Sequence, residues 1–315
     1  MSDTLTRLLE MQVNQKPAVD ISPVIAHILS RTTQKGSVSA MLLYGSGLWQ
    51  GHNDDTVWDV HVLIDNYAGF TDKTWHKIAG SLVAPNVYYF ESTSSGKVWR
   101  CKCNVMRVDQ FEKASKGKSF TPHIWARFAQ PCYMAFARSQ QDRSRVINAL
   151  SNCTLTFQSF AVPFCDTTEV SAKSLWISGF QKTYRMELRS ERSDRTAQIF
   201  EAQRNFYMSL TKGAVDDKLL PLTETGPDRY KITLSAFYIL WRRLCHTFAL
   251  PFKKLAAILR IMKSSTTFDG GVDYALWKIE RHSGITVEVT DFQRKYPLIA
   301  GWPVLWKLWR KGALK

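Results

Sequence analysis

Residues 42–65 read LLYGSGLWQGHNDDTVWDVHVLID. An apolar run ends at the glycine-rich turn Gly45-Ser46-Gly47, and a second apolar run, Val57–Ile64, carries an isolated acidic residue, Asp59. Short runs rich in β-branched and aromatic residues, bounded by turn-forming residues, are typical of strands. The sequence therefore predicts two strands joined through a glycine turn, with one carboxylate on the second strand.

This layout suits phosphate chemistry. Glycine lets the backbone approach a phosphate closely, and the backbone N–H groups of such a turn, with the Ser46 hydroxyl, can hold a triphosphate. A carboxylate on the next strand can bind Mg²⁺, which bridges phosphate oxygens. We expect Ser46 and Asp59 to be catalytic and Mg²⁺ to be the cofactor. The simpler alternative, a hairpin turn followed by an edge-strand aspartate, stays open.

Two further residues bear on the metal site. Nucleotidyltransferases usually carry Asp-x-Asp on this strand, whereas the position two after Asp59 is His61. Imidazole is a poor Mg²⁺ ligand, so His61 either contacts a phosphate or is structural. Asp65 comes at the end of the strand and completes a metal site only if the strand bends. Asp59 and Asp65 are the candidate metal ligands.

The surrounding sequence predicts an α+β fold. Residues 1–35 and 121–150 have helical periodicity, while Ala40–Tyr44, Val87–Phe90 and Val98–Val108 are predicted strands. We assign residues 1–160 to this mixed domain. Residues 161–231 are predicted to form a helical middle domain, with helices over Val170–Arg189 and Ala197–Leu210 and a linker over Lys212–Lys231.

The turn and its aspartate resemble those of the mitochondrial-type phosphatidate cytidylyltransferases, known for translocator assembly and maintenance. Members carry Tyr-Gly-Ser-Gly, which matches Tyr44–Gly47, then a single Asp that opens an apolar strand, which matches Asp59. Some members have an acidic residue six further on, where this chain has Asp65. The family tends to place an apolar residue at the position of His61.

Three later segments extend the resemblance to roughly residues 40–210. The family's Lys-Tyr-Gly-Val corresponds to Lys102–Val105, and only the Arg and Pro of its Arg-Leu-x-Lys-Pro match in Arg127–Pro131. The family pattern R-x-x-L-x-x-E-x-x-D-K is matched at Arg185, Leu188, Glu191, Asp194 and, as arginine, Arg195. Thr183 stands where the family has an aspartate.

The resemblance implies a nucleotidyltransferase (polymerase-β-like) mixed sheet domain, followed by a helical domain for which a winged helix is one form. It implies transfer of CMP from CTP to phosphatidic acid, which yields CDP-diacylglycerol and pyrophosphate. Lys102 would join Ser46 and Asp59 in catalysis. The nucleotide would be bound by Tyr44, Gly45, Ser46, Gly47, Arg127 and Arg185. On spacing alone, Lys102 reads as a solvated strand residue, and Arg127 and Arg185 read as helix-surface charges.

The C-terminal region, residues 232–315, combines aromatic and basic residues. Trp302, Trp306 and Trp309 alternate with Lys307, Arg310 and Lys311, which is the composition of a helix that lies in a membrane surface. The alternative is a helix packed on the core with a solvated basic face. Trp241–Lys263 has a similar composition and is a second candidate for membrane docking.

Composition limits the partners. The formal net charge of +15 indicates an anionic partner, which charge alone cannot assign to nucleotide, nucleic acid or acidic membrane. No apolar run reaches the ~20 residues of a membrane span, and the N-terminus has no signal-peptide pattern. We expect a peripheral protein on the cytoplasmic face of a membrane, with CTP and phosphatidic acid as partners and no nucleic acid. The six cysteines are expected to be reduced, and the oligomeric state stays open.

Two alternative functions stay open. One is another nucleotidyltransferase that acts on RNA or a small molecule. The other is a catalytically inactive nucleotidyltransferase fold that serves as a membrane or nucleic-acid adaptor, which the presence of His61 and the net charge both allow.

Overall fold

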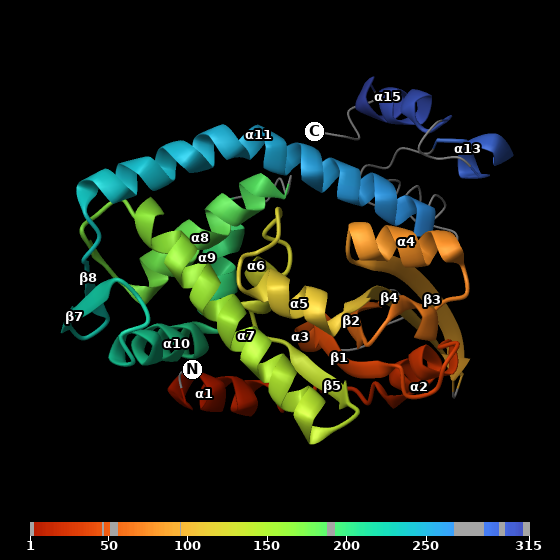
Figure 1. The fold of residues 1–315 in the computed structure, drawn as a ribbon, viewed down its shortest axis with the longest axis horizontal. Helices are drawn as coiled ribbons and strands as arrows, with labels where there is room; N and C mark the ends of the chain where they lie inside the picture. The colour runs from red at the N-terminus through yellow and green to blue at the C-terminus, as the bar shows by residue number, and fades with distance from the viewer. Residues whose placement is uncertain are drawn as a thin grey trace.

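A mixed five-stranded sheet organises the first half of the chain (Figure 1). The computed structural model describes residues 3–45, 47–50, 56–94, 96–187, 193–267, 287–295 and 300–310. The strands are β1 (Val38–Tyr44), β2 (Val57–Ile64), β3 (Asn86–Ser94), β4 (Lys97–Arg107) and β5 (Tyr133–Ala137), in the order β3-β4-β2-β1-β5. Strand β2 runs parallel to β4, and the other neighbouring pairs are antiparallel. The α+β class and the strands around the glycine turn are as predicted.

Helices cover both faces of this sheet. On one face, α2 (Ser22–Ser30) packs its buried Val24 and Ile28 against apolar side chains of β1, β2 and β4. On the other face lie α5 (Val108–Ser115), α6 (Trp125–Phe128) and α7 (Gln140–Ala161). Every residue of β1 is buried, because a central strand covered on both faces has no solvent side. The shorter helices α3 (Gly47–Gln50) and α4 (Thr74–Leu82) connect strands at the sheet's ends.

One prediction in this part was wrong. Residues 121–150 were expected to be mostly helical, but Tyr133–Ala137 form the edge strand β5, which pairs with β1. This segment, YMAFA, contains two alanines and a methionine, residues that favour helices by intrinsic propensity. Pairing with the exposed edge of β1 outweighs that local preference, since strand propensity depends strongly on tertiary context.

The second unit is helical and is closed by a small sheet. Its helices are α8 (Ala172–Met186), α9 (Ser193–Ala202) and α10 (Arg204–Asp216). Its strands are β6 (Glu169–Val170), β7 (Leu222–Gly226) and β8 (Arg229–Ile232), in the order β6-β8-β7. The predicted linker over Lys212–Lys231 is therefore wrong: its Asp, Pro, Thr and Gly residues form the end of α10 and a β-hairpin rather than a flexible connection.

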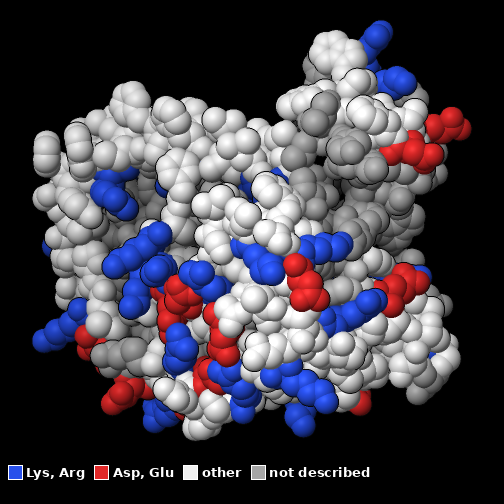
Figure 2. All heavy atoms as spheres, turned by 45° about the vertical axis from the view of Figure 1, so that its right-hand side comes forward, with Lys and Arg blue, Asp and Glu red and all other residues white. Residues whose placement is uncertain are grey.

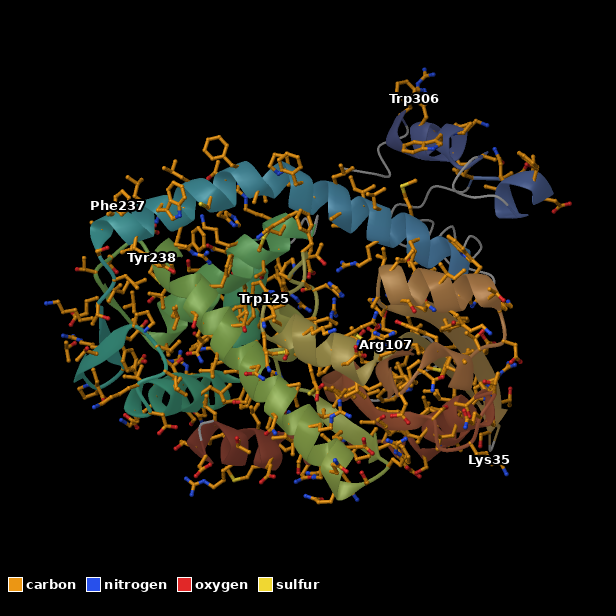
Figure 3. All side chains as sticks on the ribbon, in the orientation of Figure 1. Lys35, Arg107, Trp125, Phe237, Tyr238 and Trp306 are labelled. Atoms are coloured by element: carbon orange, nitrogen blue, oxygen red, sulfur yellow. The ribbon has the colours of Figure 1, made fainter. Side chains whose placement is uncertain are left out.

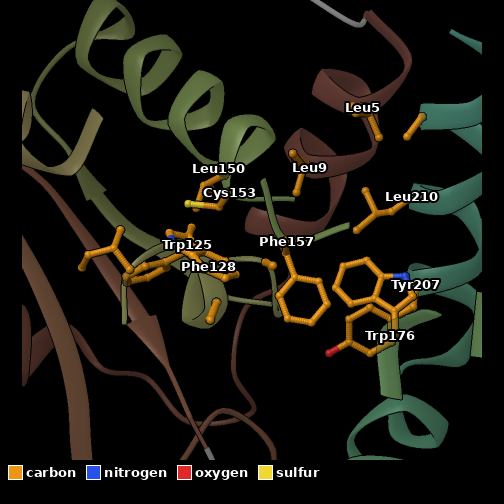
Figure 4. Close-up of a cluster of buried hydrophobic side chains, with 14 of the residues drawn as sticks. Leu5, Leu9, Trp125, Phe128, Leu150, Cys153, Phe157, Trp176, Tyr207 and Leu210 are labelled. Carbon is orange, nitrogen blue, oxygen red and sulfur yellow. The ribbon is translucent and has the colours of Figure 1, made fainter. Parts of the chain in front are cut away.

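A single hydrophobic cluster joins the two units. Figure 4 shows Phe157 of α7 beside Trp176 of α8 and Tyr207 of α10, with Leu5 and Leu9 of α1 (Asp3–Val13) close by. The rings of Phe157 and Trp176 stack with their centroids 4.7 Å apart. Helix α1 contacts both α7 and α10, so the first helix of the chain packs against elements that come far later in the sequence.

The long helix α11 (Ala236–Thr267) spans both units. In Figure 1 it runs from the small sheet past α8 to α4, and it contacts α8 and β3. The last described helices are α13 (Asp291–Lys295) and α15 (Trp302–Arg310). Within the part of the chain that the structure describes, no helix has the length and apolarity needed to cross a membrane.

Close helix packing makes Gly179 of α8 a sensitive position. A Cβ at Gly179 would lie 2.6 Å from the Cζ atom of Phe157 and 3.0 Å from the Cβ atom of Ala161. We predict that Gly179→Ala lowers the free energy of unfolding by about 1–3 kcal/mol, although alanine is the better helix former, because overpacking outweighs propensity. Denaturant unfolding would measure this, with the exposed neighbour Gln181→Ala as control. A variant as stable as the parent would contradict the close packing of α7 and α8.

Candidate functional site

Two rows of polar side chains cross one face of the five-stranded sheet. Tyr44 of β1 is paired with Asp59 of β2, which is paired in turn with Lys102 of β4. Two residues further along the same strands, His61 of β2 is paired with Asn104 of β4. Side chains at paired positions stand on the same face of a sheet, and side chains two residues apart on one strand do so too. All five side chains therefore stand on the face that α6 covers.

These rows form the floor of a cavity of about 390 Å³. The sheet, the segment that leads into α6, and α11 enclose it. The residues that line it are Tyr44, Asp59, His61, Pro85, Val87, Lys102, Asn104, His123, Ile124, Arg127, Arg260 and Ser264. Segments from four distant parts of the sequence thus build one site.

Positive charge dominates the cavity. Its lining contains three cations, Lys102, Arg127 and Arg260, and one carboxylate, Asp59. Such a cavity favours an anionic ligand that carries several negative charges, because only part of the positive charge is balanced within the lining.

Arg127 lies at the centre of this electrostatic arrangement. Its guanidinium carbon is 4.9 Å from the centre of the Tyr44 ring. Burial lowers the pKa of Arg127, but the nearby Tyr44, Glu187 and Asp59 outweigh burial, so that the net change is a raised pKa. Arg127 is therefore held in the charged form that phosphate binding requires.

Glu187 connects the second unit to this site. It caps the C-terminal end of α8, and the charges of Arg127 and Arg260 both act on it. Burial raises the pKa of Glu187, and the two arginines oppose that rise. Arg260 of α11 donates a hydrogen bond to Thr121 Oγ1 at 3.2 Å, which fixes its guanidinium group at the cavity wall.

The glycine turn stands directly against Asp59. Gly45 has a φ of +85°, a conformation that favours glycine, and a Cβ at this position would lie 3.3 Å from Asp59 Oδ2. A phosphate held by the backbone after Gly45 would therefore lie next to the Asp59 carboxylate. A Cβ at Gly47 would lie 3.3 Å from the ring of Trp58, so Gly47 packs tightly on the strand that carries Asp59.

Two histidines in the lining are neutral. Burial, followed by the charge of Arg127, lowers the pKa of His61 to about 3. Its ring lies among aromatic neighbours, with centroids 5.0 Å from Phe128 and 5.7 Å from Phe111. Burial also lowers the pKa of His123, whose Nδ1 atom lies 2.7 Å from Thr121 Oγ1. His61 is thus a neutral, buried ring among aromatic side chains that also lines the cavity, where its Nε2 atom has no hydrogen-bond partner among the described residues.

The donor atoms of the cavity fit a magnesium ion that is shared with a substrate phosphate. Mg²⁺ is commonly bound by one or two carboxylates together with phosphate oxygens, and Asp59 supplies one carboxylate. Across the described residues, no group of three or more His, Cys, Asp and Glu side chains is placed to hold a metal. A phosphate ligand would have to supply the remaining oxygens.

The structure brings most of the predicted site residues together. Tyr44, Asp59, Lys102 and Arg127 all line the cavity, and Gly45 touches Asp59. Ser46 lies outside the described residues. Arg185 is exposed on the last turn of α8 and does not line the cavity, although its charge reaches His246 of α11.

Asp65 lies at the opposite end of β2 from Asp59. Tyr44 pairs with Asp59 at one end of the ladder, and Val38 pairs with Ile64 at the other. Asp65 accepts hydrogen bonds from Ser39 and from Arg138, which also binds Asp142. Strand β2 is continuous from Val57 to Ile64, so six residues separate the two carboxylates by about 20 Å. Asp65 is part of an ion-pair network beyond the end of β2 and does not line the cavity.

Several residues of the site escaped the sequence analysis. No motif marks His123 or Ser264, and Arg260 lies in the segment Trp241–Lys263, which was expected to dock on a membrane. The fold alone brings these residues to Asp59. Asn104, which donates a hydrogen bond to the Tyr44 hydroxyl at 2.6 Å, could have been found. It stands two residues after Lys102 in a predicted strand and so shares its face.

The C-terminal helix predicted from the sequence is present. Trp302 and Trp306 of α15 are 58% and 60% exposed, and Lys307 and Arg310 are exposed as well, whereas Val304 is buried. Figure 3 shows Trp306 on the outer side of the molecule. The side chain of Trp309, and Lys311 entirely, lie outside the described part.

Comparison with family models and with curated proteins gives no significant match.

Polar contacts fasten α11, one wall of the cavity, to the body. Arg243 donates hydrogen bonds to the backbone carbonyls of Pro163 and Cys165, each at 2.6 Å. Lys263 donates to the carbonyl of Pro85 at 2.9 Å, and burial lowers its pKa to about 7. Between these two contacts, the ring of His246 packs edge-on against Phe164 with a centroid separation of 4.8 Å.

His246 makes this attachment sensitive to acid. Burial, then the charges of Lys253 and other basic neighbours, lowers its pKa to about 4, whereas a histidine in an unfolded chain has a pKa of about 6.5. The neutral ring therefore stabilises the fold fully above about pH 6.5, and this contribution is lost as the pH falls toward 4, because the unfolded chain binds the proton more readily. We predict that His246→Phe moves the acid unfolding midpoint to lower pH.

Circular dichroism across a pH series would measure this shift. The exposed neighbour provides a control, since Cys245→Ser should leave the acid midpoint where it is in the parent protein. An unchanged midpoint in the His246→Phe variant would show that His246 does not contribute to the acid sensitivity.

Proposed function

We propose that this protein is a nucleotidyltransferase that transfers CMP from CTP to phosphatidic acid, giving CDP-diacylglycerol and pyrophosphate. The observation that carries the proposal is the cavity at Asp59. There a glycine turn, an isolated carboxylate and three cations meet on one face of a mixed sheet. This combination suits a triphosphate better than a neutral ligand.

The connectivity of the sheet supports the same class. The strand that ends in the glycine turn is antiparallel to the strand that carries Asp59, which in turn is parallel to β4. That arrangement agrees with the polymerase-β-like domain implied by the resemblance. The second unit, with helices followed by the β7–β8 hairpin, agrees with a winged helix.

Each group of the cavity then has a role in binding the triphosphate. The backbone after Gly45 would hold phosphate oxygens next to Asp59, and Lys102 and Arg127 would neutralise their charge from two sides. Arg127 is well suited to this role, since a guanidinium group can bind two phosphate oxygens at once. Asp59 would hold Mg²⁺, which, when bound, stabilises the charge that develops on the leaving pyrophosphate.

The acceptor needs little activation. The phosphate monoester of phosphatidic acid has a second pKa of about 6 and is largely a dianion near neutral pH. One of its oxygens attacks the α-phosphorus of CTP as the bond to pyrophosphate breaks. This chemistry therefore requires little help from a general base.

The proposed acceptor is a membrane lipid, so the protein must bind the membrane surface. The exposed Trp302 and Trp306 with Lys307 and Arg310 give α15 the composition of an interfacial helix. We propose docking on the cytoplasmic face of an anionic membrane.

A second candidate rests on His61. The position where many nucleotidyltransferases have their second metal ligand holds an uncharged histidine buried among aromatic rings. This favours a fold that binds a nucleotide without turning it over and acts as a membrane adaptor. Formation of labelled CDP-diacylglycerol from labelled CTP distinguishes the two candidates.

The decisive assay incubates the protein with labelled CTP, Mg²⁺ and phosphatidic acid in detergent. We predict that Asp59→Asn abolishes formation of labelled CDP-diacylglycerol, because removal of a metal ligand costs several kcal/mol of transition-state stabilisation. The matched control is Asp65→Asn, the same change at the other end of the same strand. It should weaken the network with Arg138 and leave turnover nearly unchanged.

If the parent binds CTP but forms no product, the adaptor candidate is favoured. Equal losses in the two aspartate variants would remove Asp59 from the mechanism. Replacement of phosphatidic acid by RNA or by glycerol phosphate tests the other acceptor classes in the same assay.

The contribution of α15 to docking is a separate prediction. Replacing Trp302 and Trp306 by serine should weaken binding to vesicles that contain phosphatidic acid, because indole groups favour the headgroup layer. Both side chains are more than half exposed, so the fold should be unaffected. Vesicle co-sedimentation at low and high salt measures the binding, with Trp75→Ser on α4, 54% exposed, as the control. Unchanged binding of the double variant would mean that α15 is not an anchor.

A further inference from the structure

A second, larger cavity of about 580 Å³ lies against α11. Its other walls are the segment after α5 and one side of α7. The residues that line it are Lys116, Gly117, Ser119, Phe120, Thr121, Pro122, Trp125, Leu155, Thr156, Ser159, Phe160, Tyr238, Arg242 and Lys253. In Figure 3, Tyr238 and Trp125 lie on the side of α11 that faces the body. None of these residues belongs to the Asp59 cavity.

The charges of this cavity are all positive. Lys116, Arg242 and Lys253 line it, and its lining contains no acidic residue. Among the described residues, none of the three has an ion pair with a carboxylate. Lys253 is partly buried, and burial and then the charge of Arg242 lower its pKa. Lys116 and Arg242 are exposed at the mouth of the cavity. Because a partly buried cation such as Lys253 is costly without a counter-charge, the cavity is suited to an anion that comes from outside the protein.

The same cavity offers apolar surface beside its cations. Trp125 and Phe160 contribute their rings from inside, with centroids 5.1 Å apart, and Phe120 is 61% exposed at the segment that forms one wall. A ligand with a charged head and an apolar part would therefore be complementary to it.

An apolar stripe follows the outer side of α11. Its members are Phe237, Leu240, Trp241, Leu244, Phe248, Phe252, Leu255, Ile258 and Leu259, each between 40% and 77% exposed. Their spacing of three and four residues places them on one side of the helix. Figure 2 shows the upper left rim as a largely uncharged surface, while Lys, Arg, Asp and Glu gather lower on this face and at the top right. A stripe this long is far more than scattered surface apolar residues and marks an interaction site.

The cations and the stripe belong to one helix in a fixed relation. Arg242 and Lys253 are eleven residues apart, which is close to three helical turns, and both lie on the flank between the stripe and the protein body. Arg260 follows seven residues after Lys253 on the same flank and enters the Asp59 cavity. The two cavities are thus placed one after the other along α11, with wall residues about 10 Å apart.

We propose that the cavity of Lys116, Arg242 and Lys253 is a headgroup site for an anionic phospholipid, whose acyl chains lie along the apolar stripe of α11. The phosphate group would meet the three uncompensated cations, and the stripe would enter the apolar layer of the membrane. Charge complementarity selects this occupant over a second copy of the chain, which carries a net charge of +15 and would bring further positive charge to the cavity. The site goes beyond the proposed function, because it requires neither CTP nor Asp59.

The test is vesicle binding without nucleotide. Full-length protein is mixed with phosphatidylcholine vesicles, with or without phosphatidic acid, and sedimented. Lys253→Gln and Arg242→Gln should each weaken binding to the anionic vesicles by more than the about fivefold that one cation near an anionic surface contributes through diffuse charge. The matched control is Lys254→Gln, the next residue on the same helix, which does not line the cavity. Its loss should be clearly smaller.

Further arms separate the possible outcomes. Phe248→Ser with Phe252→Ser should reduce binding to both kinds of vesicle, since these side chains lie in the stripe and not in the cavity. Asp59→Asn should bind vesicles like the parent even where it has lost turnover, so failure of this site and failure of the proposed function are distinguishable. Glycerol phosphate added in excess should compete only weakly, because it lacks acyl chains.

Three results would overturn the proposal. Equal losses for Lys253→Gln and Lys254→Gln would mean that diffuse charge, and no headgroup cavity, drives binding. Full competition by glycerol phosphate would indicate a site for soluble phosphates. A stripe variant that turns a dimer into a monomer in analytical ultracentrifugation, with vesicle binding intact, would assign the stripe to self-association.

Discussion

The register of β2 between its two neighbours is the constraint on which the site depends. Antiparallel pairing with β1 sets Tyr44 opposite Asp59, and parallel pairing with β4 sets Lys102 on the other side. A slip of one residue on β2 would turn Asp59 to the opposite face, where the buried Trp58 now packs against α2 and its neighbours. The apolar pattern of β2 holds the register, because Trp58, Val60, Val62 and Ile64 must all stay in that second core. Burial of these apolar side chains on one face of the sheet thus holds Asp59 on the other face.

The two cavities differ in how far acidic groups balance their positive charge, and this difference distinguishes their roles. In the Asp59 cavity the cations are partly balanced by Asp59 and by Glu187, so the site can remain structured before a ligand arrives. The cavity at Lys253 has no such balance in its lining. Helix α11 supplies cations to both, and its contacts with Pro163, Cys165 and Pro85 determine how those cations are placed. The helix is therefore as important to the electrostatics as to the packing.

The sequence alone predicted the structural elements that depend on interactions between nearby residues. The glycine turn, its flanking strands, the strands β3 and β4 and the helix α15 follow from periodicity and turn chemistry, which act over a few residues. Strand β5 could not be predicted, because its alanines and methionine favour a helix and only the free edge of β1 makes them a strand. The β7–β8 hairpin was mistaken for a linker for a related reason: its polar residues are typical of both.

The residues of the candidate site also differ in whether the sequence alone could predict them. Asp59 could be found because it lies on a predicted strand after the glycine turn, and the resemblance pointed to Tyr44, Lys102 and Arg127. Asp65 follows the end of β2 that is farther from the cavity. Arg260 lies in a segment whose composition suggested membrane docking, and only the path of α11 across the molecule brings it to Asp59. Residues contributed by long-range packing carry no local pattern.

The position of α1 has a consequence for how the chain is made. Leu5 and Leu9 are buried against α7 and α10, and a Cβ at Gly213 of α10 would lie 3.0 Å from Thr4. Helix α1 therefore has no complete packing partner until residues beyond 210 have been synthesised. During that interval its leucines stay exposed, and folding of the five-stranded sheet alone cannot bury them. The sheet can assemble early, but the final closure of the core must wait for the contact between α1 and the second unit.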